Sequence, residues 1–272
     1  MKKTMKLICL VLALVMLLAL AACGGGKGTT TVTKGKLTMA TNAQFPPYEF
    51  YEGDKIVGID AEIAEAIADE LGLELEIVDT EFGSIIGGVQ TGKYDIGMAG
   101  MTVTDERKES VNFSNTYAKA KQVVIVPADS EIESFEEFYT EFDADGNPAA
   151  VADGVKIGVQ QDTTGDIYSS DDPEKWGFGE DNVLRYKTGA DAVQALLAGK
   201  VTCVIIDNEP AKSFVAANEG LKILDGAYAD EDYAIAVGKD NEELLKNIND
   251  ALAKLTESGK LDEIVAKYIP AE

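Results

Sequence analysis

Short runs of β-forming residues alternate with amphipathic helical patterns along most of this 272-residue chain. The clearest helical pattern covers residues 59–71, where an aliphatic side chain recurs every four positions and Gly72 follows as a stop signal. Further helices are expected at residues 189–198, 241–258 and 261–268. Strands are expected at residues 37–41, 73–78, 95–98, 122–126, 155–159, 201–206 and 233–237. This alternation predicts an α/β fold.

Two stretches interrupt the pattern. Residues 141–154 and 169–181 are rich in acidic residues, Gly and Pro, and neither shows a helical or strand period. We therefore predict surface loops at both places.

The N-terminal residues have the pattern of a secretory signal. Three lysines precede an apolar run over residues 7–20, which is shorter than the roughly 20 residues of a membrane-spanning helix, the alternative interpretation. Residues 20–23, Leu-Ala-Ala-Cys, resemble a bacterial lipobox. We expect a lipoprotein signal peptide over residues 1–22, and Cys23 as the acylated (palmitate-bearing) anchor to the bacterial cell membrane. A flexible tether rich in Gly, Thr and Lys would complete residues 23–35.

The composition argues against several functions. The chain has 48 Asp plus Glu against 24 Lys plus Arg, a net charge of −24, so it repels phosphate backbones and we expect no nucleic-acid binding. It contains no histidine, the commonest general base and metal ligand, so we expect no enzyme, metal or cofactor. Cys203 has no partner in the mature chain and is expected to be a small buried apolar residue.

Two motifs carry a resemblance to a known family. Residues 58–63 read Gly-Ile-Asp-Ala-Glu-Ile, and residues 94–107 read Tyr-Asp-Ile-Gly-Met-Ala-Gly-Met-Thr-Val-Thr-Asp-Glu-Arg. Both are similar to motifs of the family 3 extracellular solute-binding proteins, which serve polar amino-acid ABC importers. Residues 41–49 and 82–92 match as well, and the resemblance spans roughly residues 35–269. Ala61 departs from it, because the family usually has a larger residue there.

The resemblance implies a two-lobed, type II periplasmic-binding-protein-like fold. Lobe 1 would comprise residues 36–116 plus 233–272, and lobe 2 residues 122–228. Two crossover strands, residues 117–121 and 229–232, would form the hinge. A free amino acid bridging the lobes would favour the closed form, which docks on the membrane subunits of the ABC transporter.

An amino-acid ligand needs an anion site. The planar fork of Arg107 can donate two parallel hydrogen bonds to a carboxylate. The resemblance assigns Arg107 this role and places Gly100 and Thr102 beside it. On spacing alone, Arg107 could instead be a solvated residue of a short helix that Thr104 caps.

Lobe 2 supplies two further candidates by resemblance. The backbone N–H of Thr164 would meet the same carboxylate, and Asp207 would bind the ligand ammonium. Asp207 could alternatively cap a helix that begins near Pro210. Asp162 stands where the family usually has Gly, and its direction is undetermined by the sequence.

The ligand side chain would lie between two rings. Phe45 and Phe82 match positions that sandwich the side chain in relatives, although core packing is the alternative for any Phe. Asn42 stands where relatives often have an Asp that meets a distal amide or cation. Because ring faces attract cations, we expect Gln or a basic residue such as Arg or Lys ahead of Glu and Asp.

Two rival functions remain: an enzyme on the same fold, such as a dehydratase, and a ligand-sensing input domain. The chain contains neither G-x-S-x-G nor GK[ST], so it shows no signature of acyl or phosphoryl transfer. A sensor would need a membrane span and a signalling domain downstream. We therefore favour a binding protein of an importer.

Overall fold

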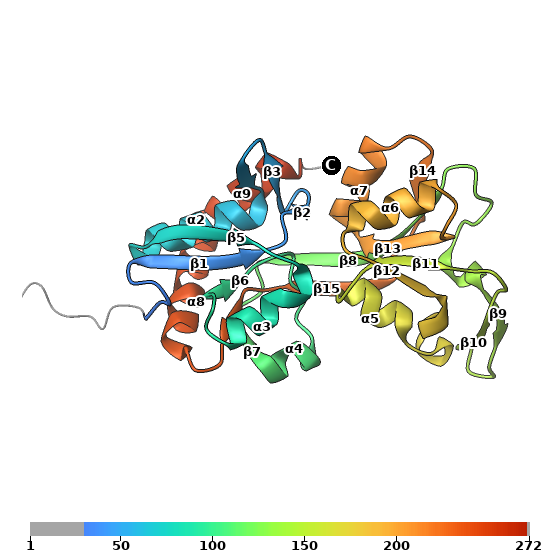
Figure 1. Cartoon of the computed structure of the whole chain (residues 1–272), viewed down its shortest axis with the longest axis horizontal. Helices are drawn as coiled ribbons and strands as arrows, with labels where there is room; N and C mark the ends of the chain where they lie inside the picture. The colour runs from blue at the N-terminus through green and yellow to red at the C-terminus, as the bar shows by residue number, and fades with distance from the viewer. Residues whose placement is uncertain (1–29, 271–272) are drawn as a thin grey trace, which may run out of the picture. The chain divides into compact units, whose positions relative to one another are not determined.

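The computed structural model describes residues 30–270, which form two α/β lobes (Figure 1). We call the part built on the five-stranded sheet lobe 1 and the part built on the six-stranded sheet lobe 2. The elements of lobe 1 are β1 (Lys36–Thr41), β2 (Gln44–Phe45), β3 (Glu49–Glu52), β4 (Lys55–Val57), α2 (Ile59–Leu71), β5 (Glu74–Asp79), η1 (Phe82–Ser84), α3 (Ile85–Gln90), β6 (Ile96–Gly97), α4 (Asp105–Ser110), β7 (Val111–Phe113), β16 (Ala236–Gly238), α8 (Glu242–Glu257) and α9 (Lys260–Tyr268).

The elements of lobe 2 are β8 (Ala118–Pro127), η2 (Phe135–Phe138), β9 (Tyr139–Phe142), β10 (Pro148–Val151), β11 (Ile157–Gln160), α5 (Thr164–Ser170), η3 (Pro173–Lys175), η4 (Glu180–Asn182), β12 (Val183–Tyr186), α6 (Gly189–Leu197), β13 (Cys203–Asp207), α7 (Asn208–Ala217), β14 (Leu221–Ile223) and β15 (Ala229–Tyr233). The strands and helices confirm the predicted α/β class, and they include several elements, such as α5 and α7, that the pattern did not predict.

The sheet of lobe 1 has the order β5-β1-β6-β16-β7 and is covered by helices on both faces. Successive strand residues point to opposite faces. Met39 packs in the cluster formed with α2 and α8, whereas its neighbour Ala40 packs in the cluster formed with α3. Burial on both faces explains why every residue of β1 after Lys36 is buried, Thr38 and Thr41 included.

The sheet of lobe 2 has the order β12-β11-β13-β8-β14, and β15 also pairs with β8. Strand β13 alternates in the same way: Val204 and Ile206 share a cluster with α6 and α7, whereas Cys203 and Ile205 face the cluster that contains Phe138 and Phe178. Cys203 is fully buried, which confirms its expected packing role, and burial raises the pKa of its thiol.

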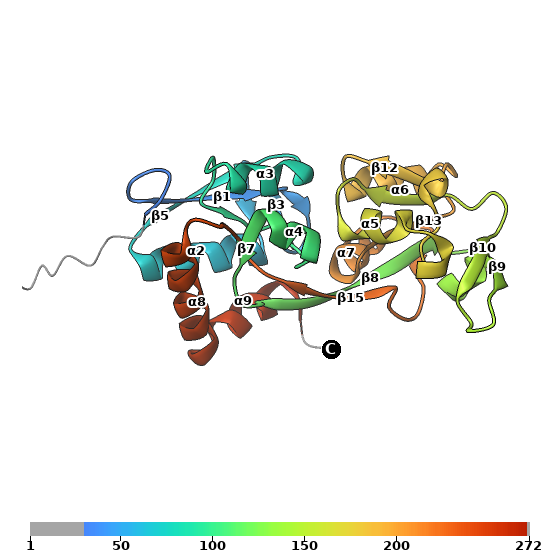
Figure 2. The same cartoon turned by 90° about the horizontal axis from the view of Figure 1, so that it is seen from below.

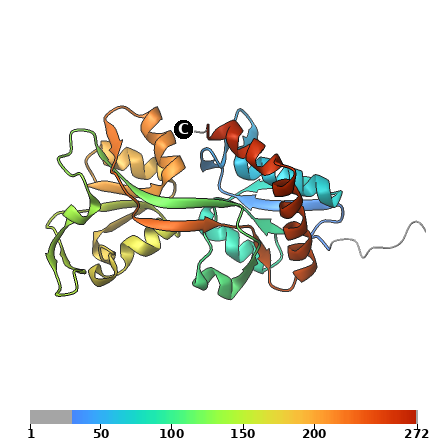
Figure 3. The ribbon, with the colours of Figure 1, turned by 180° about the vertical axis from the view of Figure 1, so that it is seen from behind.

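Strands β8 and β15 run side by side between the two lobes, as Figures 2 and 3 show. They pair antiparallel from Ala118↔Tyr233 to Gln122↔Ala229. The two predicted crossover segments, residues 117–121 and 229–232, therefore lie against each other. Motion about them remains a prediction.

The predicted helices agree with the structure better than the predicted loops do. All four predicted helices form, and 59–71 matches α2 at both ends, with Gly72 in a left-handed conformation at its C-terminus. The predicted loop at 141–154 is wrong in part, because β9 and β10 form a hairpin there. The predicted loop at 169–181 is also wrong in part, since it contains η3 and the buried Phe178. Both segments are held by tertiary contacts to aromatic side chains, which no local period reveals.

The folded part begins earlier than predicted. Residues 31–35 were expected to belong to the flexible tether, but the backbone N–H of Val32 donates to Asp95 at 2.7 Å, and Lys36 N donates to Thr33 O at 3.0 Å. The predicted signal peptide and Cys23 lie outside the described residues. Within residues 30–270, no helix is both long and apolar enough to cross a membrane.

Candidate functional site

The eight candidate residues of the sequence analysis line a single cavity. These are Asn42, Phe45, Phe82, Gly100, Thr102, Arg107, Thr164 and Asp207, and they are joined there by Glu49, Ala99, Gln160 and Thr163. The cavity has a volume of about 10 Å³, room for about one water molecule. Their ligand-binding roles remain predictions, but the fold brings all eight together.

The sheets explain this convergence. Strands β1, β6, β11 and β13 end at Thr41, Gly97, Gln160 and Asp207. These ends and the turns that follow carry half of the cavity residues: Asn42, Ala99, Gly100, Gln160, Thr163 and Asp207. The carboxyl ends of parallel strands are the usual place of ligand sites in open α/β sheets. Strands β1 and β6 belong to lobe 1, and β11 and β13 to lobe 2, so both lobes contribute to the cavity wall.

Arg107 is a buried cation at the cavity wall, with only 8% of its surface exposed. One terminal nitrogen donates to Thr102 O at 2.8 Å, and the other donates across the lobes to Asp162 O at 3.1 Å. Among residues 30–270, no carboxylate lies within 4 Å to pair with it. Burial lowers the pKa of Arg107, opposed chiefly by the Glu231 carboxylate. A buried guanidinium with unused donors is a receptor for an anion.

The structure confirms the helix cap by Thr104 but not a solvated side chain for Arg107. Thr104 does cap α4, because its side chain accepts from Arg107 N at 3.1 Å. The side chain of Arg107 is nevertheless buried, with its guanidinium 5.3 Å from the centre of the Phe82 ring. The cap and the cavity role therefore coexist. Phe82 stacks on the cation, an arrangement that holds the guanidinium plane.

Asp207 is the opposite charge at the cavity wall. It occupies the N-cap position of α7, as the alternative interpretation predicts, yet its side chain makes no capping bond. Instead it accepts a hydrogen bond from the hydroxyl of Tyr233. Burial, and then the neighbouring Glu231 carboxylate, raise the pKa of Asp207 well above its usual range. A buried carboxylate of this kind gains stability when a cation binds beside it.

Glu49 and Asp60 form a second buried acidic group, which the sequence analysis did not single out. Both are fully buried, and Asp60 Oδ2 accepts from Gly100 N at 2.8 Å and from the Tyr117 hydroxyl at 2.9 Å. No hydrogen-bond donor among the described residues reaches either oxygen of Glu49. Burial and the adjacent Asp60 charge raise the pKa of Glu49 well above its usual range, and burial raises the pKa of Asp60 to about 6.

Direct contacts between the lobes close the cavity. Gln160 Nε2 of lobe 2 donates to Asn42 Oδ1 of lobe 1 at 2.9 Å, and the outer rim carries the ion pair of Lys187 with Glu81 at 2.8 Å. Asn42 is further fixed by donating to Thr80 O at 2.8 Å. Because the cavity holds about one water, a larger ligand enters only if these contacts separate.

Phe45 lies both in the apolar core and at the cavity wall, and its contact with a ligand stays a prediction. Only 7% of its surface is exposed. Gly100 lies directly beneath the ring: a Cβ there would approach Phe45 Cε1 to 2.8 Å, and its φ of +51° disfavours other residues. Glycine is therefore needed at this position.

The structure shows the direction of the Asp162 side chain, which the sequence left undetermined. Its φ is 64°, the left-handed conformation that glycine adopts most readily. Its carboxylate lies over Gly83 of lobe 1, where an added Cβ would meet Oδ2 at 2.1 Å. The charge thus points away from the cavity, and only the carbonyl of Asp162 contacts Arg107. Thr164 is 3% exposed, and its hydroxyl accepts from Gln122 Nε2 at 3.3 Å.

Some cavity residues escaped the sequence analysis, which quoted Glu49 within a matching motif but gave it no role. Gln160, two positions before Asp162, was not among the candidate residues. The signal that could have found both was their place at the start of β3 and the end of β11, once the strands are known. In residues 30–270, no group of three or more Cys, Asp or Glu side chains is arranged to hold a metal ion.

Known proteins similar in sequence and in structure include amino acid-binding proteins. The chain is 34% identical to the arginine-binding extracellular protein ArtP of Bacillus subtilis over 242 residues, 88% of each chain. An ancestral arginine-binding protein bound to glutamine superposes with a TM-score of 0.76 at 34% identity, covering 88% of this chain and all of the other. The ancestral amino acid-binding protein AncCDT-1, a precursor of cyclohexadienyl dehydratase, gives a TM-score of 0.74 at 29% identity, covering 86% and 96%.

The family assignment rests on nearly all of the folded chain. Residues 37–271 match the family of bacterial extracellular solute-binding proteins, family 3. The two-lobed α/β architecture is that of the type II periplasmic binding proteins, as the sequence motifs predict. This chain belongs to the bacterial extracellular solute-binding proteins of family 3.

Proposed function

We propose that the cavity binds a free L-amino acid, with L-arginine as the favoured ligand and L-glutamine as the neutral alternative. One observation carries the proposal: a buried Arg107 with unused donors and a buried Asp207 line the same small cavity. The first complements an α-carboxylate and the second an α-ammonium. A zwitterion therefore satisfies two buried charges that are costly alone.

The preference for a basic side chain comes from the remaining charges. Glu49 also lines the cavity, and Asp207 contributes to the pKa shifts of both Arg107 and Glu49. Asp207 is therefore near both groups, and we infer that a ligand held by Arg107 and Asp207 would extend its side chain toward Glu49. A guanidinium there would meet an acid group and the ring of Phe45. A glutamate side chain would find no cation there and would further oppose ionisation of Glu49.

Calorimetric titration tests this assignment. L-Arginine, L-lysine, L-histidine, L-glutamine, L-cystine, L-glutamate, L-aspartate and L-leucine would be compared, with agmatine as the matched probe that lacks only the carboxylate of arginine. We expect L-arginine or L-glutamine to bind tightest and agmatine to bind much more weakly. Tightest binding to glutamate, aspartate or leucine would contradict the ligand class.

We further propose that the protein delivers its ligand to the membrane subunits of an ABC importer and acts as a binder without turnover. Its similarity to ArtP and to other amino acid-binding proteins supports this role. The extracytoplasmic location would be maintained by a lipid on Cys23, which lies outside the described residues. Cys23→Ser should abolish acylation and release the folded protein from the membrane fraction. A variant that still carries lipid would contradict the anchor.

A further inference from the structure

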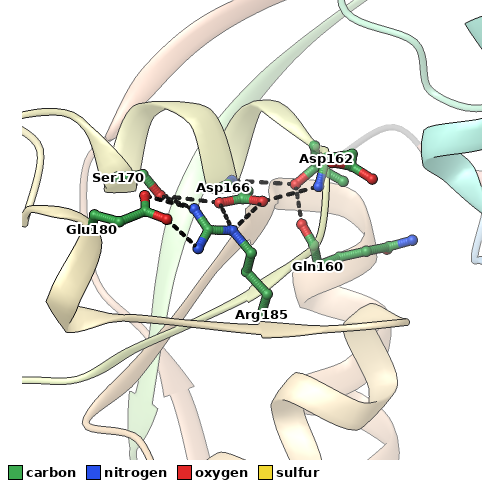
Figure 4. A network of polar contacts seen from close by, with 7 residues as sticks. Gln160, Asp162, Asp166, Ser170, Glu180 and Arg185 are labelled. Carbon is green, nitrogen blue, oxygen red and sulfur yellow. Dashed lines mark hydrogen bonds and ion pairs between the residues drawn. The ribbon is translucent and has the colours of Figure 1, made fainter.

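A network of hydrogen bonds connects the surface of lobe 2 to the loop of residues 160–164, which lies beside the cavity (Figure 4). Glu180 accepts from both terminal nitrogens of Arg185, at 2.8 and 2.9 Å. Arg185 Nε donates to the carboxylate of Asp166 at 2.9 Å. That carboxylate accepts at the same time from the backbone N–H of Asp162 at 3.0 Å. The carbonyl of Asp162 then accepts from Arg107 of lobe 1.

Asp166 is the central residue of this hydrogen-bond network. Only 5% of its surface is exposed, and its carboxylate accepts from the Asp162 amide, the Arg185 guanidinium and the hydroxyl of Ser170. The same Ser170 hydroxyl accepts from Arg185 at 2.8 Å, so the three side chains fix one another. Several donors hold this buried carboxylate in one orientation. The carboxylate in turn fixes the Asp162 amide that donates a hydrogen bond to it.

The amide matters because Asp162 adopts a left-handed conformation with φ of 64°. For a residue other than glycine this conformation costs roughly 1–2 kcal/mol, so surrounding contacts must maintain it. It also directs the Asp162 carbonyl at the guanidinium of Arg107. Without the bond to Asp166, the loop would relax and the carbonyl would turn away.

We propose that Arg185 and Asp166 are positioning residues for ligand capture: they hold the 160–164 loop so that the Asp162 carbonyl orients Arg107 when the lobes close. Neither lines the cavity, so both act through the loop. The carbonyls of Thr102 and Asp162 come from different lobes and bind different nitrogens of Arg107. Closure thereby completes the anion receptor, and opening removes one of its two supports. This inference rests on the proposed amino-acid ligand.

The test compares Arg185→Met with Lys175→Met. The second variant removes an exposed ion pair of the same lobe, Lys175 with Asp171, that does not touch the loop. We expect Arg185→Met to raise the Kd for L-arginine about tenfold, mainly through faster dissociation, because it loosens hydrogen bonds to a charged group. Lys175→Met should remain within about twofold, as expected for a surface pair. Arg185→Lys should restore part of the affinity.

Two further measurements separate positioning from general stability. In an Asp162→Gly background, Arg185→Met should weaken binding less than threefold, because glycine adopts the left-handed conformation without help. In the ligand-free protein, Arg185→Met should speed hydrogen exchange of the Asp162 amide at least tenfold while leaving the melting temperature near that of Lys175→Met.

Wild-type affinity in Arg185→Met, or an unchanged penalty in the glycine background, would overturn the proposal. If wild type bound none of the amino acids tested, the proposed ligand class would fail. The role of Arg185 would then be judged by amide exchange in the ligand-free protein, where an unchanged rate at Asp162 contradicts it.

Discussion

Replacing Glu49 by Gln should make the ligand-free protein more stable at alkaline pH. Glu49 is fully buried without a hydrogen-bond donor in residues 30–270, and burial and Asp60 raise its pKa well above the usual 4.5. The folded state therefore keeps a proton that the unfolded chain loses. Since the folded state binds more protons, the free energy of unfolding falls as pH rises through this window. Gln retains the shape of the protonated carboxyl and removes the penalty.

The magnitude follows from linkage. One retained proton contributes a slope of about 1.4 kcal/mol per pH unit, so Glu49 would account for at most about 2 kcal/mol between pH 6.5 and 8. Starting at pH 6.5 reduces the contribution of Asp60, whose pKa of about 6 lies below this window. Urea unfolding of wild type and Glu49→Gln at several pH values measures the difference in slope. Glu257→Gln, which changes an exposed carboxyl on α8, is the control.

The same substitution should weaken the binding of L-arginine, because the cavity loses the group that can ionise beside a guanidinium. Stability and affinity would then change in opposite directions. Equal pH slopes for wild type and Glu49→Gln, or a variant less stable than wild type at pH 8, would refute the argument about the buried proton.

Three other results are expected. Arg107→Lys should weaken amino-acid binding at least tenfold, about 1.4 kcal/mol, because an ammonium cannot reproduce the two-pronged contact, and an affinity within twofold of wild type would remove Arg107 from the site. Gly100→Ala should lower the free energy of unfolding by about 1–3 kcal/mol in urea titrations, since its Cβ meets the ring of Phe45 at a positive φ, and an unchanged midpoint would contradict that strain. A saturating amino acid should shift small-angle scattering toward the closed form, and no compaction from an open ligand-free ensemble would count against hinge closure.

The sequence by itself determined the α/β class and part of the elements, including the helices α2, α6, α8 and α9. The four-residue period of α2 and the glycine that ends it are local features, and so they place a helix without knowledge of its partners. The family motifs also located eight of the residues that line the cavity, and some of them, such as Asn42 and Asp207, lie at or just after a strand end. The sequence did not predict the hairpin of β9 and β10, because pairing between the two strands and packing against aromatic side chains hold it together.

Tertiary structure alone decided which of those residues meet and what surrounds them. Glu49 and Asp60 are eleven positions apart on different elements, and only folding removes both from water and places their carboxyls together. The bond between Gln160 and Asn42 joins residues 118 positions apart. The hydrogen-bond network that links Arg185 to Asp162 likewise requires β12 to pair with β11. This pairing brings the Arg185 side chain and the Asp162 amide to Asp166. Such contacts depend on strand order and lobe closure, and no local pattern in a sequence records either.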